Sequence, residues 1–142
     1  MLNIVNSSNL RILLVEDNAI TRLYVQALLE SYGCDVVIAK NGEEAVTNFG
    51  SHIDGVLMDI GLPDINGCQA TRRIRQKYPK ENTLIYACSA FDRNCDLMCE
   101  QFGMNGFIQK PCRRNEVEDF LLAVNKKITA ISSISVMERQ AV

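Results

Sequence analysis

The chain has 142 residues, of which 47% are hydrophobic and 23% are charged, and its formal net charge is −2. This length and composition predict one soluble globular domain with little room for a second. The charge balance argues against direct nucleic-acid binding, which usually requires a basic face. No apolar stretch reaches the roughly 18 residues of a membrane helix, and residues 1–9 lack the pattern of a signal peptide, so no membrane contact is expected.

The cysteines indicate a reduced protein rather than a metal or disulfide framework. No Cys-x-x-Cys pair is present, and His52 is the single histidine. Cys95 and Cys99 stand four residues apart in a predicted helix, which would permit a metal clip or a redox pair, but buried reduced cysteine is the more common use. We therefore expect a reduced, cytoplasmic protein.

Predicted strands and helices alternate five times along the chain. Five apolar runs predict the strands, in chain order: Ile12–Val15, Asp35–Ala39, Val56–Met58, Leu84–Cys88 and Phe107–Gln109. The helices are predicted from periodicity and stop signals: one carrying Ile20, Leu23, Ala27 and Leu28 and ending at Gly33, then Glu43–Phe49, Cys68–Lys77, Arg93–Phe102 and Arg113–Thr129.

This alternation predicts an α/β domain with a parallel sheet covered on both faces, because each crossover helix must pack back onto the sheet. We expect a doubly wound, flavodoxin-like (βα)5 fold over residues 10–129. Residues 1–9 form an N-terminal extension. Residues 130–142 show no clear period and are expected to be a tail or linker stub.

Reactive polar groups end four of the five strands. Asp59 follows the third strand, Glu16 and Asp17 follow the first, Ser89 follows the fourth and Lys110 follows the fifth. Because the carboxyl ends of parallel strands meet at one edge of the sheet, where open α/β folds place their ligands, we expect these groups to converge in one site.

The order and spacing of these residues resemble a response-regulator receiver domain, the phosphoacceptor module of two-component signalling. Pro63 and Gly67 follow Asp59 by four and eight positions, Ser89 follows it by 30, and the Lys110–Pro111 pair follows it by 51. The resemblance covers about Leu10 to Ile128. Its departures are mild, with Glu-Asp in place of Asp-Asp and Ser in place of Thr.

The resemblance implies a role for each polar residue. Asp59 would accept a phosphoryl group, and Mg²⁺, with Mn²⁺ as a possible substitute, would be held by Asp17, Asp59 and the Gly61 carbonyl, with Glu16 acting through water. A divalent cation also removes the repulsion among three close carboxylates. Lys110 and Ser89 would bind phosphoryl oxygens. Pro63, Gly67 and Pro111 would be structural, and the Lys110–Pro111 bond is expected to be cis.

The resemblance also implies a conformational switch. Movement of Ser89 toward the phosphoryl group would open space into which Phe107 can turn, altering the face formed by helix 4, strand 5 and helix 5, which could also support a homodimer. Phe107 is otherwise plain core. Gly61 and Phe91 occupy positions that tune phosphoryl lifetime, and they favour slow self-dephosphorylation.

Two biological settings remain open for such a module. It is expected to be the receiver of a hybrid sensor histidine kinase, relaying to a histidine phosphotransfer protein from the cytoplasmic portion of a membrane-bound parent. The alternative is a free-standing regulator phosphorylated by a histidine kinase. No Gly-rich nucleotide loop is present, so the chain itself is not expected to be an enzyme.

Two rival functions use the same residues. An aspartate-nucleophile phosphatase would need an acid two residues after Asp59, where this chain has Gly61. An unphosphorylated interaction module would not need the complete site. The third helix also carries four basic residues, Arg72, Arg73, Arg75 and Lys77. They are interpreted as a solvated face, and partner docking is the less favoured interpretation.

Overall fold

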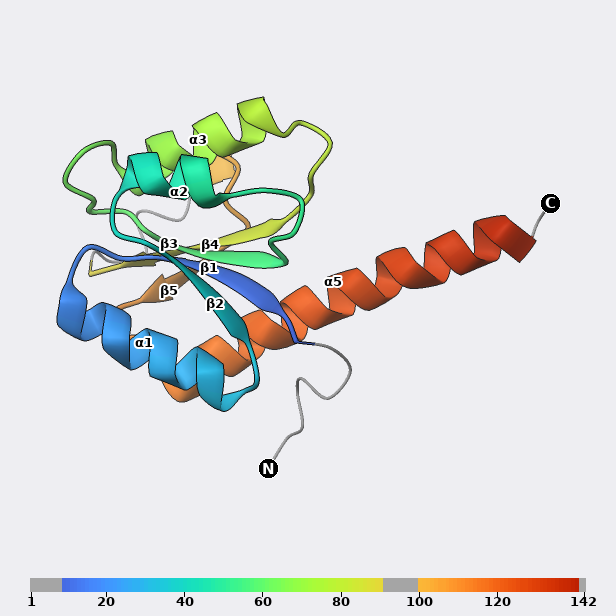
Figure 1. The fold of residues 1–142 in the computed structure, drawn as a ribbon, viewed down its shortest axis with the longest axis horizontal. Helices are drawn as coiled ribbons and strands as arrows, with labels where there is room; N and C mark the ends of the chain where they lie inside the picture. The colour runs from blue at the N-terminus through green and yellow to red at the C-terminus, as the bar shows by residue number, and fades with distance from the viewer. Residues whose placement is uncertain (1–8, 91–99, 141–142) are drawn as a thin grey trace.

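The computed structural model describes residues 9–90 and 100–140. Five strands form one parallel sheet in the order β2-β1-β3-β4-β5, which confirms the flavodoxin-like arrangement (Figure 1). The strands lie at β1 Arg11–Val15, β2 Asp35–Ala39, β3 Gly55–Asp59, β4 Leu84–Ser89 and β5 Gly106–Gln109. The strand order reverses direction at β1 and β3, so their carboxyl ends flank the crevice in which such sheets bind ligands.

Helices cover both faces of the sheet. They lie at α1 Ala19–Ser31, α2 Gly42–Asn48, α3 Gly67–Lys77 and α5 Arg114–Gln140. Helices α1 and α5 lie on one face, and α2 and α3 lie on the other (Figure 1). None of the helices in the described part of the chain is long and apolar enough to cross a bilayer.

The central strands contain continuous apolar runs, Ile12–Val15 in β1 and Val56–Met58 in β3, because both of their faces are buried. In β1, Ile12 and Leu14 pack toward α1 and α5, whereas Leu13 and Val15 pack toward α2 and α3. Phe120 of α5 is fully buried against the first of these faces. Burial of one such side chain stabilises the fold by about 1.5–3 kcal/mol, which fixes the strands that carry the polar groups.

Asparagine caps begin three helices at the carboxyl edge of the sheet. The side chain of Asn18 accepts from the backbone N–H groups of Ile20 and Thr21, both at 3.0 Å. Asn41 caps α2, and Asn66 forms a capping box with Gln69 at the start of α3. These caps satisfy backbone donors that would otherwise lack partners.

Gly67 is required by the close approach of α3 to the end of β3. A Cβ atom at this position would lie 2.2 Å from the backbone oxygen of Asp59. The Gly67 N–H also donates to the Ile60 carbonyl at 3.0 Å. The structural role predicted for Gly67 therefore has a steric basis next to Asp59 itself.

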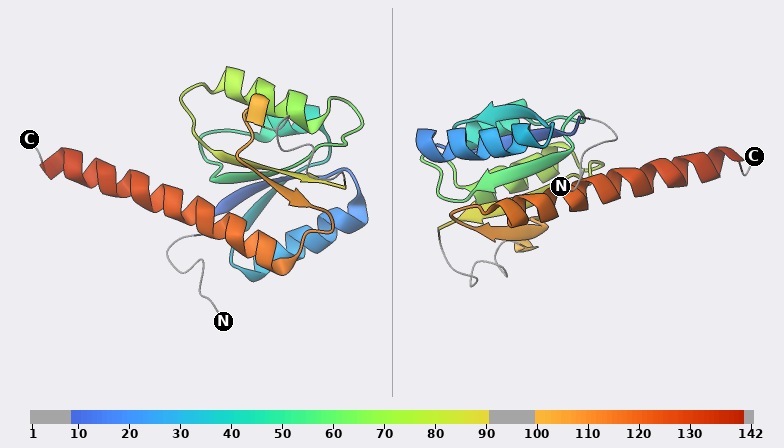
Figure 2. Two further views of the ribbon diagram at one scale, coloured as in Figure 1. Left: turned by 180° about the vertical axis from the view of Figure 1, so that it is seen from behind. Right: turned by 90° about the horizontal axis from the view of Figure 1, so that it is seen from below.

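The predicted end of the last helix at Thr129 is wrong, since α5 continues to Gln140. Beyond the domain the helix projects into solvent (Figure 2), and Ile131, Ile134 and Met137 are exposed on it. Because this segment does not pack on the core, its apolar residues do not recur at helical spacing. Residues 112–142 nevertheless contain neither glycine nor proline, so no sequence signal ends the helix. A domain boundary at residue 130 remains a prediction.

Other details of the helices also differ from expectation. In α1 the core residues are Val25, Leu28 and Leu29, whereas Ile20 and Leu23 point to solvent. Most of the helix predicted over 93–102 lies outside the described residues, although residues 100 and 101 are described and are helical. Phe91, Cys95 and Cys99 also lie outside the described residues.

Arg75 is not part of a solvated basic face. Its half-buried guanidinium donates to the Gly103 carbonyl at 3.1 and 2.9 Å and to the Asn105 side chain at 2.9 Å. Arg75 therefore ties α3 to the segment that precedes β5.

Candidate functional site

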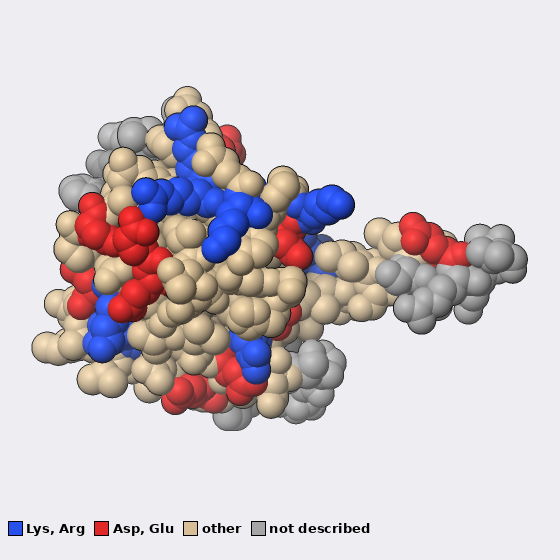
Figure 3. All heavy atoms as spheres, turned by 45° about the horizontal axis from the view of Figure 1, so that its top comes forward, with Lys and Arg blue, Asp and Glu red and all other residues tan. Residues whose placement is uncertain are grey.

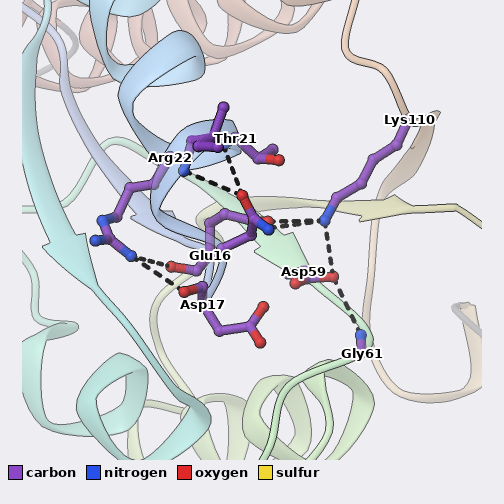
Figure 4. A network of polar contacts seen from close by, with 9 residues as sticks. Glu16, Asp17, Thr21, Arg22, Asp59, Gly61 and Lys110 are labelled. Atoms are coloured by element: carbon purple, nitrogen blue, oxygen red, sulfur yellow. Dashed lines mark hydrogen bonds and ion pairs between the residues drawn. The ribbon is translucent and has the colours of Figure 1, made fainter.

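A cavity of about 310 Å³ lies at the carboxyl edge of the sheet. It is lined by residues at or just after the ends of β1, β3, β4 and β5 and by the first turn of α1: Glu16, Asp17, Asn18, Thr21, Asp59, Gly61, Ser89, Ala90 and Lys110. The structure therefore brings together the polar groups that the sequence placed at four separate strand ends. Figure 4 shows several of these side chains converging between β1 and β3.

Three carboxylates form the acidic part of the site, the carboxylate cluster of Glu16, Asp17 and Asp59. One oxygen from each lies within 4.8 Å of the others. Glu16 and Asp59 are buried, with 2% and 4% of their surface exposed, whereas Asp17 is exposed. Hard oxygen donors at this separation suit Mg²⁺ or Mn²⁺.

Lys110 is the cation that balances two of these carboxylates. Its Nζ lies 3.0 and 2.8 Å from the two Glu16 carboxylate oxygens and 3.3 Å from Asp59 Oδ1 (Figure 4). Burial acts to lower the pKa of Lys110, but the Glu16 and Asp59 carboxylates outweigh burial and raise it. Lys110 is therefore a fixed positive charge beside Asp59.

Burial raises the pKa of Glu16 from 4.5 to about 7. The Lys110 ammonium acts in the opposite direction, and Asp59 adds to the upward shift. Burial and the neighbouring Asp59 carboxylate thus both oppose ionisation of Glu16, and a divalent cation bound beside them would relieve this penalty.

Backbone contacts fix the acceptor side of the site. Asp59 is the last residue of β3, and the Gly61 N–H donates to its Oδ1 at 3.1 Å. Ser89 is buried at the end of β4, and its carbonyl accepts from the Lys110 N–H at 2.8 Å. The sheet register therefore sets Asp59, Ser89 and Lys110 side by side.

The other predicted residues in the described part of the chain do not line this cavity. Phe107 of β5 is half-buried against the core on the α2 and α3 side, and it lines a separate surface cavity with Lys110. The Lys110–Pro111 peptide is cis, as the resemblance implied. Pro63 lies exposed in the loop between β3 and α3. Phe91 lies outside the described residues.

Arg22 is a site residue that the sequence did not reveal. Its guanidinium donates to the backbone carbonyls of Glu16 at 3.0 Å and Asp17 at 3.4 Å (Figure 4). These bonds hold the loop that positions both carboxylates. The signal was weak, because an arginine six residues after Glu16 in an amphipathic helix looks like an ordinary solvated residue.

The α1 apolar surface, formed by Ile20, Leu23 and Tyr24, is a second feature that the sequence did not reveal, since periodicity had placed Ile20 and Leu23 on the packed face of the helix. These side chains are 81%, 65% and 53% exposed beside the site. The α1 cavity, of about 430 Å³, lies next to them and is lined by Ile20, Thr21, Tyr24, Val25, Lys110, Pro111 and Cys112. Large exposed apolar groups beside a cavity are typical of protein-binding surfaces.

Charged side chains on the opposite layer do not converge on the site. Arg72, Arg73 and Lys77 of α3 are exposed, and basic side chains form a band across the face shown in Figure 3. Arg73 pairs with Glu43 at 2.8 Å, and both side chains are about half exposed. Exposed pairs of this kind contribute at most about 1 kcal/mol, so this face is interpreted as solvated.

Comparisons with known proteins agree with this geometry. A sequence profile of the response regulator receiver domain matches residues 12–122. The chain is 31% identical over 130 residues to the autoinducer 1 sensor kinase/phosphatase LuxN of Vibrio campbellii, covering 91% of this chain and 15% of LuxN. This chain is much shorter than such relatives, and it spans 7% to 16% of the lengths of LuxN and four other sensor kinases.

Two solved structures extend the comparison. The receiver domain of the sensor histidine kinase PA1611 from Pseudomonas aeruginosa, solved with magnesium in its active-site cleft, is 35% identical, with a TM-score of 0.71 over 80% of this chain and 95% of that one. The Ssk1 receiver domain of Saccharomyces cerevisiae, solved with the histidine phosphotransfer protein Ypd1, is 27% identical, with a TM-score of 0.68 over 85% of this chain and 87% of that one. With its parallel five-stranded sheet and its carboxylate cluster at the strand ends, the chain belongs to the response regulator receiver domain family.

Proposed function

We propose that Asp59 accepts a phosphoryl group and that this modification controls the protein contacts of the domain. The observation that carries the proposal is the single cavity shared by Asp59, two further carboxylates, the Ser89 hydroxyl and the Lys110 ammonium. Phosphoryl transfer depends mainly on positioning and on neutralising the charge of the phosphoryl oxygens. This set of groups supplies both.

The donor set fits a magnesium ion. Asp17, Asp59 and the Gly61 carbonyl would hold it directly, and Glu16 would act through water; Mn²⁺ is expected to substitute. When bound, the ion neutralises negative charge on the carboxylates and on the phosphoryl group. The PA1611 receiver supports this assignment, because it holds magnesium in its active-site cleft.

The chain's own residues supply the remaining chemistry. A carboxylate oxygen of Asp59 attacks phosphorus, the leaving group departs with the bonding electron pair, and an acyl phosphate forms on Asp59. Lys110, already 3.3 Å from Asp59, pairs with one phosphoryl oxygen. The Ser89 hydroxyl donates to another, and the accompanying shift of the β4 end allows Phe107 to turn inward. Gly61 and Phe91 are proposed to make self-dephosphorylation slow.

The direct test is incubation with acetyl phosphate and Mg²⁺, followed by intact-mass measurement. The wild type should gain one phosphoryl group, which hydroxylamine removes because it attacks acyl phosphates. Asp59→Asn should gain none, whereas Asp35→Asn, an exposed matched control at the start of β2, should behave as the wild type. Labelling of Asp59→Asn, or a hydroxylamine-resistant label, would refute the proposal.

The partner is proposed to be a histidine phosphotransfer protein, with this chain acting as the receiver of a cytoplasmic hybrid-kinase segment. The matches to sensor kinases and to the Ssk1 receiver, which was solved with such a protein, support this setting. A free-standing regulator is the alternative. The α1 apolar surface is the proposed docking site, since it lies beside the cavity that contains Asp59.

Phosphotransfer between the domain and a histidine phosphotransfer protein tests this docking surface. Leu23→Ser should slow transfer at limiting partner concentration without changing labelling by acetyl phosphate. Leu122→Ser is the matched control, because Leu122 is an exposed leucine on α5. Equal slowing by both variants would contradict docking at α1.

The rival phosphatase function is distinguished in the same incubation. A phosphoacceptor takes up one phosphoryl group per chain, whereas a phosphatase would release phosphate through many turnovers of a phosphate monoester. Gly61 cannot act as the general acid that such an enzyme needs two residues after its nucleophile. A homodimer through the face formed by helix 4, β5 and α5 remains a prediction, and most of the predicted helix 4 lies outside the described residues.

A further inference from the structure

Two cysteines flank the proposed phosphoryl site on its buried side. Cys88 and Cys112 are 5% and 4% exposed and belong to the core cluster that faces α1 and α5. Their side chains hydrogen bond to each other. A disulfide can form only between cysteines that are neighbours in space, and the hydrogen bond makes Cys88 and Cys112 neighbours within one cluster.

Their positions in the chain connect the pair to the site. Cys88 lies in β4, immediately before Ser89, and pairs in the sheet with Asp59 on one side and Ile108 on the other. Cys112 follows Lys110 by two residues. A bond between Cys88 and Cys112 would therefore tie together the two backbone segments that carry Ser89 and Lys110.

Small molecules have a route to one of the two thiols. Cys112 forms part of the wall of the α1 cavity. The hydrogen bond from Cys88 lowers the pKa of Cys112, whereas burial opposes this change. Cys34 is the contrasting case, because burial raises its pKa to about 12. Of two thiols, the one with more thiolate character and with access to a cavity is the one that oxidants attack first.

We propose that Cys88 and Cys112 form a redox-sensitive disulfide that regulates phosphorylation of the domain. The Cys112 sulfur attacks one oxygen of hydrogen peroxide, breaking the O–O bond and giving a sulfenic acid and water. The Cys88 sulfur then attacks the Cys112 sulfur, and a second water leaves. In total two thiols and one peroxide give one disulfide and two waters, and thiol reductants reverse the change.

The regulatory part of this inference rests on the proposed function. The crosslink restrains the β4 end, which must move when Ser89 contacts a phosphoryl group, and it restrains the segment that positions Lys110. We expect oxidation to slow phosphorylation by about tenfold or more, because a displacement of about 1 Å at a reacting group can reduce a rate by about 100-fold.

Peptide mapping tests the crosslink directly. Oxidised monomer is alkylated and cut with trypsin and a protease that cleaves after glutamate, which places Cys88 alone in peptide 82–93 and Cys112 alone in peptide 101–113, with Cys95 and Cys99 together in 94–100. The linked pair 82–93/101–113 should dominate after treatment with peroxide. Recovery of Cys88 and Cys112 mainly as alkylated thiols would overturn the proposal. Crosslinks formed mainly with peptide 94–100 would also overturn it.

Variants separate the two chemical steps. Cys112→Ser should abolish the linked pair, and Cys34→Ser, the matched buried control, should retain it. In Cys88→Ser, Cys112 should accumulate as a sulfenic acid that a cyclic diketone traps. Absence of that adduct, while the wild type forms the link, would refute Cys112 as the thiol that is attacked first.

The phosphorylation assay is then run on reduced, oxidised and re-reduced wild type with acetyl phosphate and Mg²⁺. The oxidised monomer should be slower by about tenfold or more, with the rate restored by reductant. Equal rates before and after formation of the link would refute the regulatory role. Failure of the reduced protein to accept phosphate would instead refute the proposed function, and the peptide map would still decide whether the disulfide forms.

Discussion

Glu16 is expected to make the metal-free protein less stable as the pH rises. Its pKa is about 7 in the folded protein, where it is buried, against 4.5 in the unfolded chain. Between these values the folded protein binds the extra proton, so the free energy of unfolding falls as the pH increases. This difference in pKa corresponds to a loss of about 3 kcal/mol in the free energy of unfolding. The loss is absent below pH 4.5 and complete above pH 7.

Glu16→Gln tests this reasoning, because glutamine resembles the protonated carboxyl and cannot ionise. Without metal, the variant should exceed the wild type in free energy of unfolding by about 3 kcal/mol at pH 8 and match it near pH 4. Mg²⁺ should narrow the difference at pH 8, since a divalent cation stabilises the ionised wild-type site.

Urea unfolding at the two pH values, with and without Mg²⁺, measures these differences. The chain contains no tryptophan, so far-UV circular dichroism is the suitable signal. Glu30→Gln serves as control, because Glu30 is exposed on α1, and its effect should stay within about 0.5 kcal/mol. The reasoning is refuted if Glu16→Gln is less stable than the wild type at pH 8 in the absence of metal.

Three further outcomes are expected. Gly67→Ala should lower the free energy of unfolding, measured in urea, by about 3 kcal/mol because the added Cβ would meet the Asp59 carbonyl. Gly61→Ala is the control, because a Cβ at Gly61 has space, and it should change the free energy of unfolding by less than about 1 kcal/mol. Equal effects of the two substitutions would contradict the steric argument. Truncation after Thr129 should reduce helix content by circular dichroism yet leave the unfolding midpoint unchanged, because Ile131, Ile134 and Met137 of the removed segment are exposed. A large drop in the midpoint would show that the segment packs on the domain. Lys110→Met should raise the pKa of Glu16 above about 7, because the Lys110 ammonium lowers that pKa in the wild type. A carbon-detected NMR titration measures the change, and an unchanged pKa would show that the ammonium does not affect Glu16.

The strands and the polar residues at their ends could be predicted from the sequence. The five apolar runs are continuous because both faces of a parallel sheet are buried, and a residue that ends such a run must lie at its carboxyl edge. The strand pattern alone therefore predicts that Asp17, Asp59, Ser89 and Lys110 lie together. The assignment of chemical roles came from the resemblance in spacing.

Which side of α1 meets the sheet could not be predicted in the same way. Apolar residues occur around much of this helix, so periodicity favoured Ile20 and Leu23 where packing selected Val25 and Leu29. The end of α5 could not be predicted for a related reason. The part of a helix that does not contact the core need not place apolar residues at helical spacing, so periodicity does not reveal it.

The sequence by itself determined the order of the strands along the chain and which reactive groups end them, since both follow from local patterns a few residues long. Only the tertiary structure decided that Lys110 pairs with Glu16 as well as Asp59, that Gly67 touches the Asp59 backbone and that Cys88 meets Cys112. Apart from the Gly67 contact, these interactions join residues at least 24 positions apart in the chain. Their geometry depends on how the helices and loops pack around the sheet, and no local pattern records that packing.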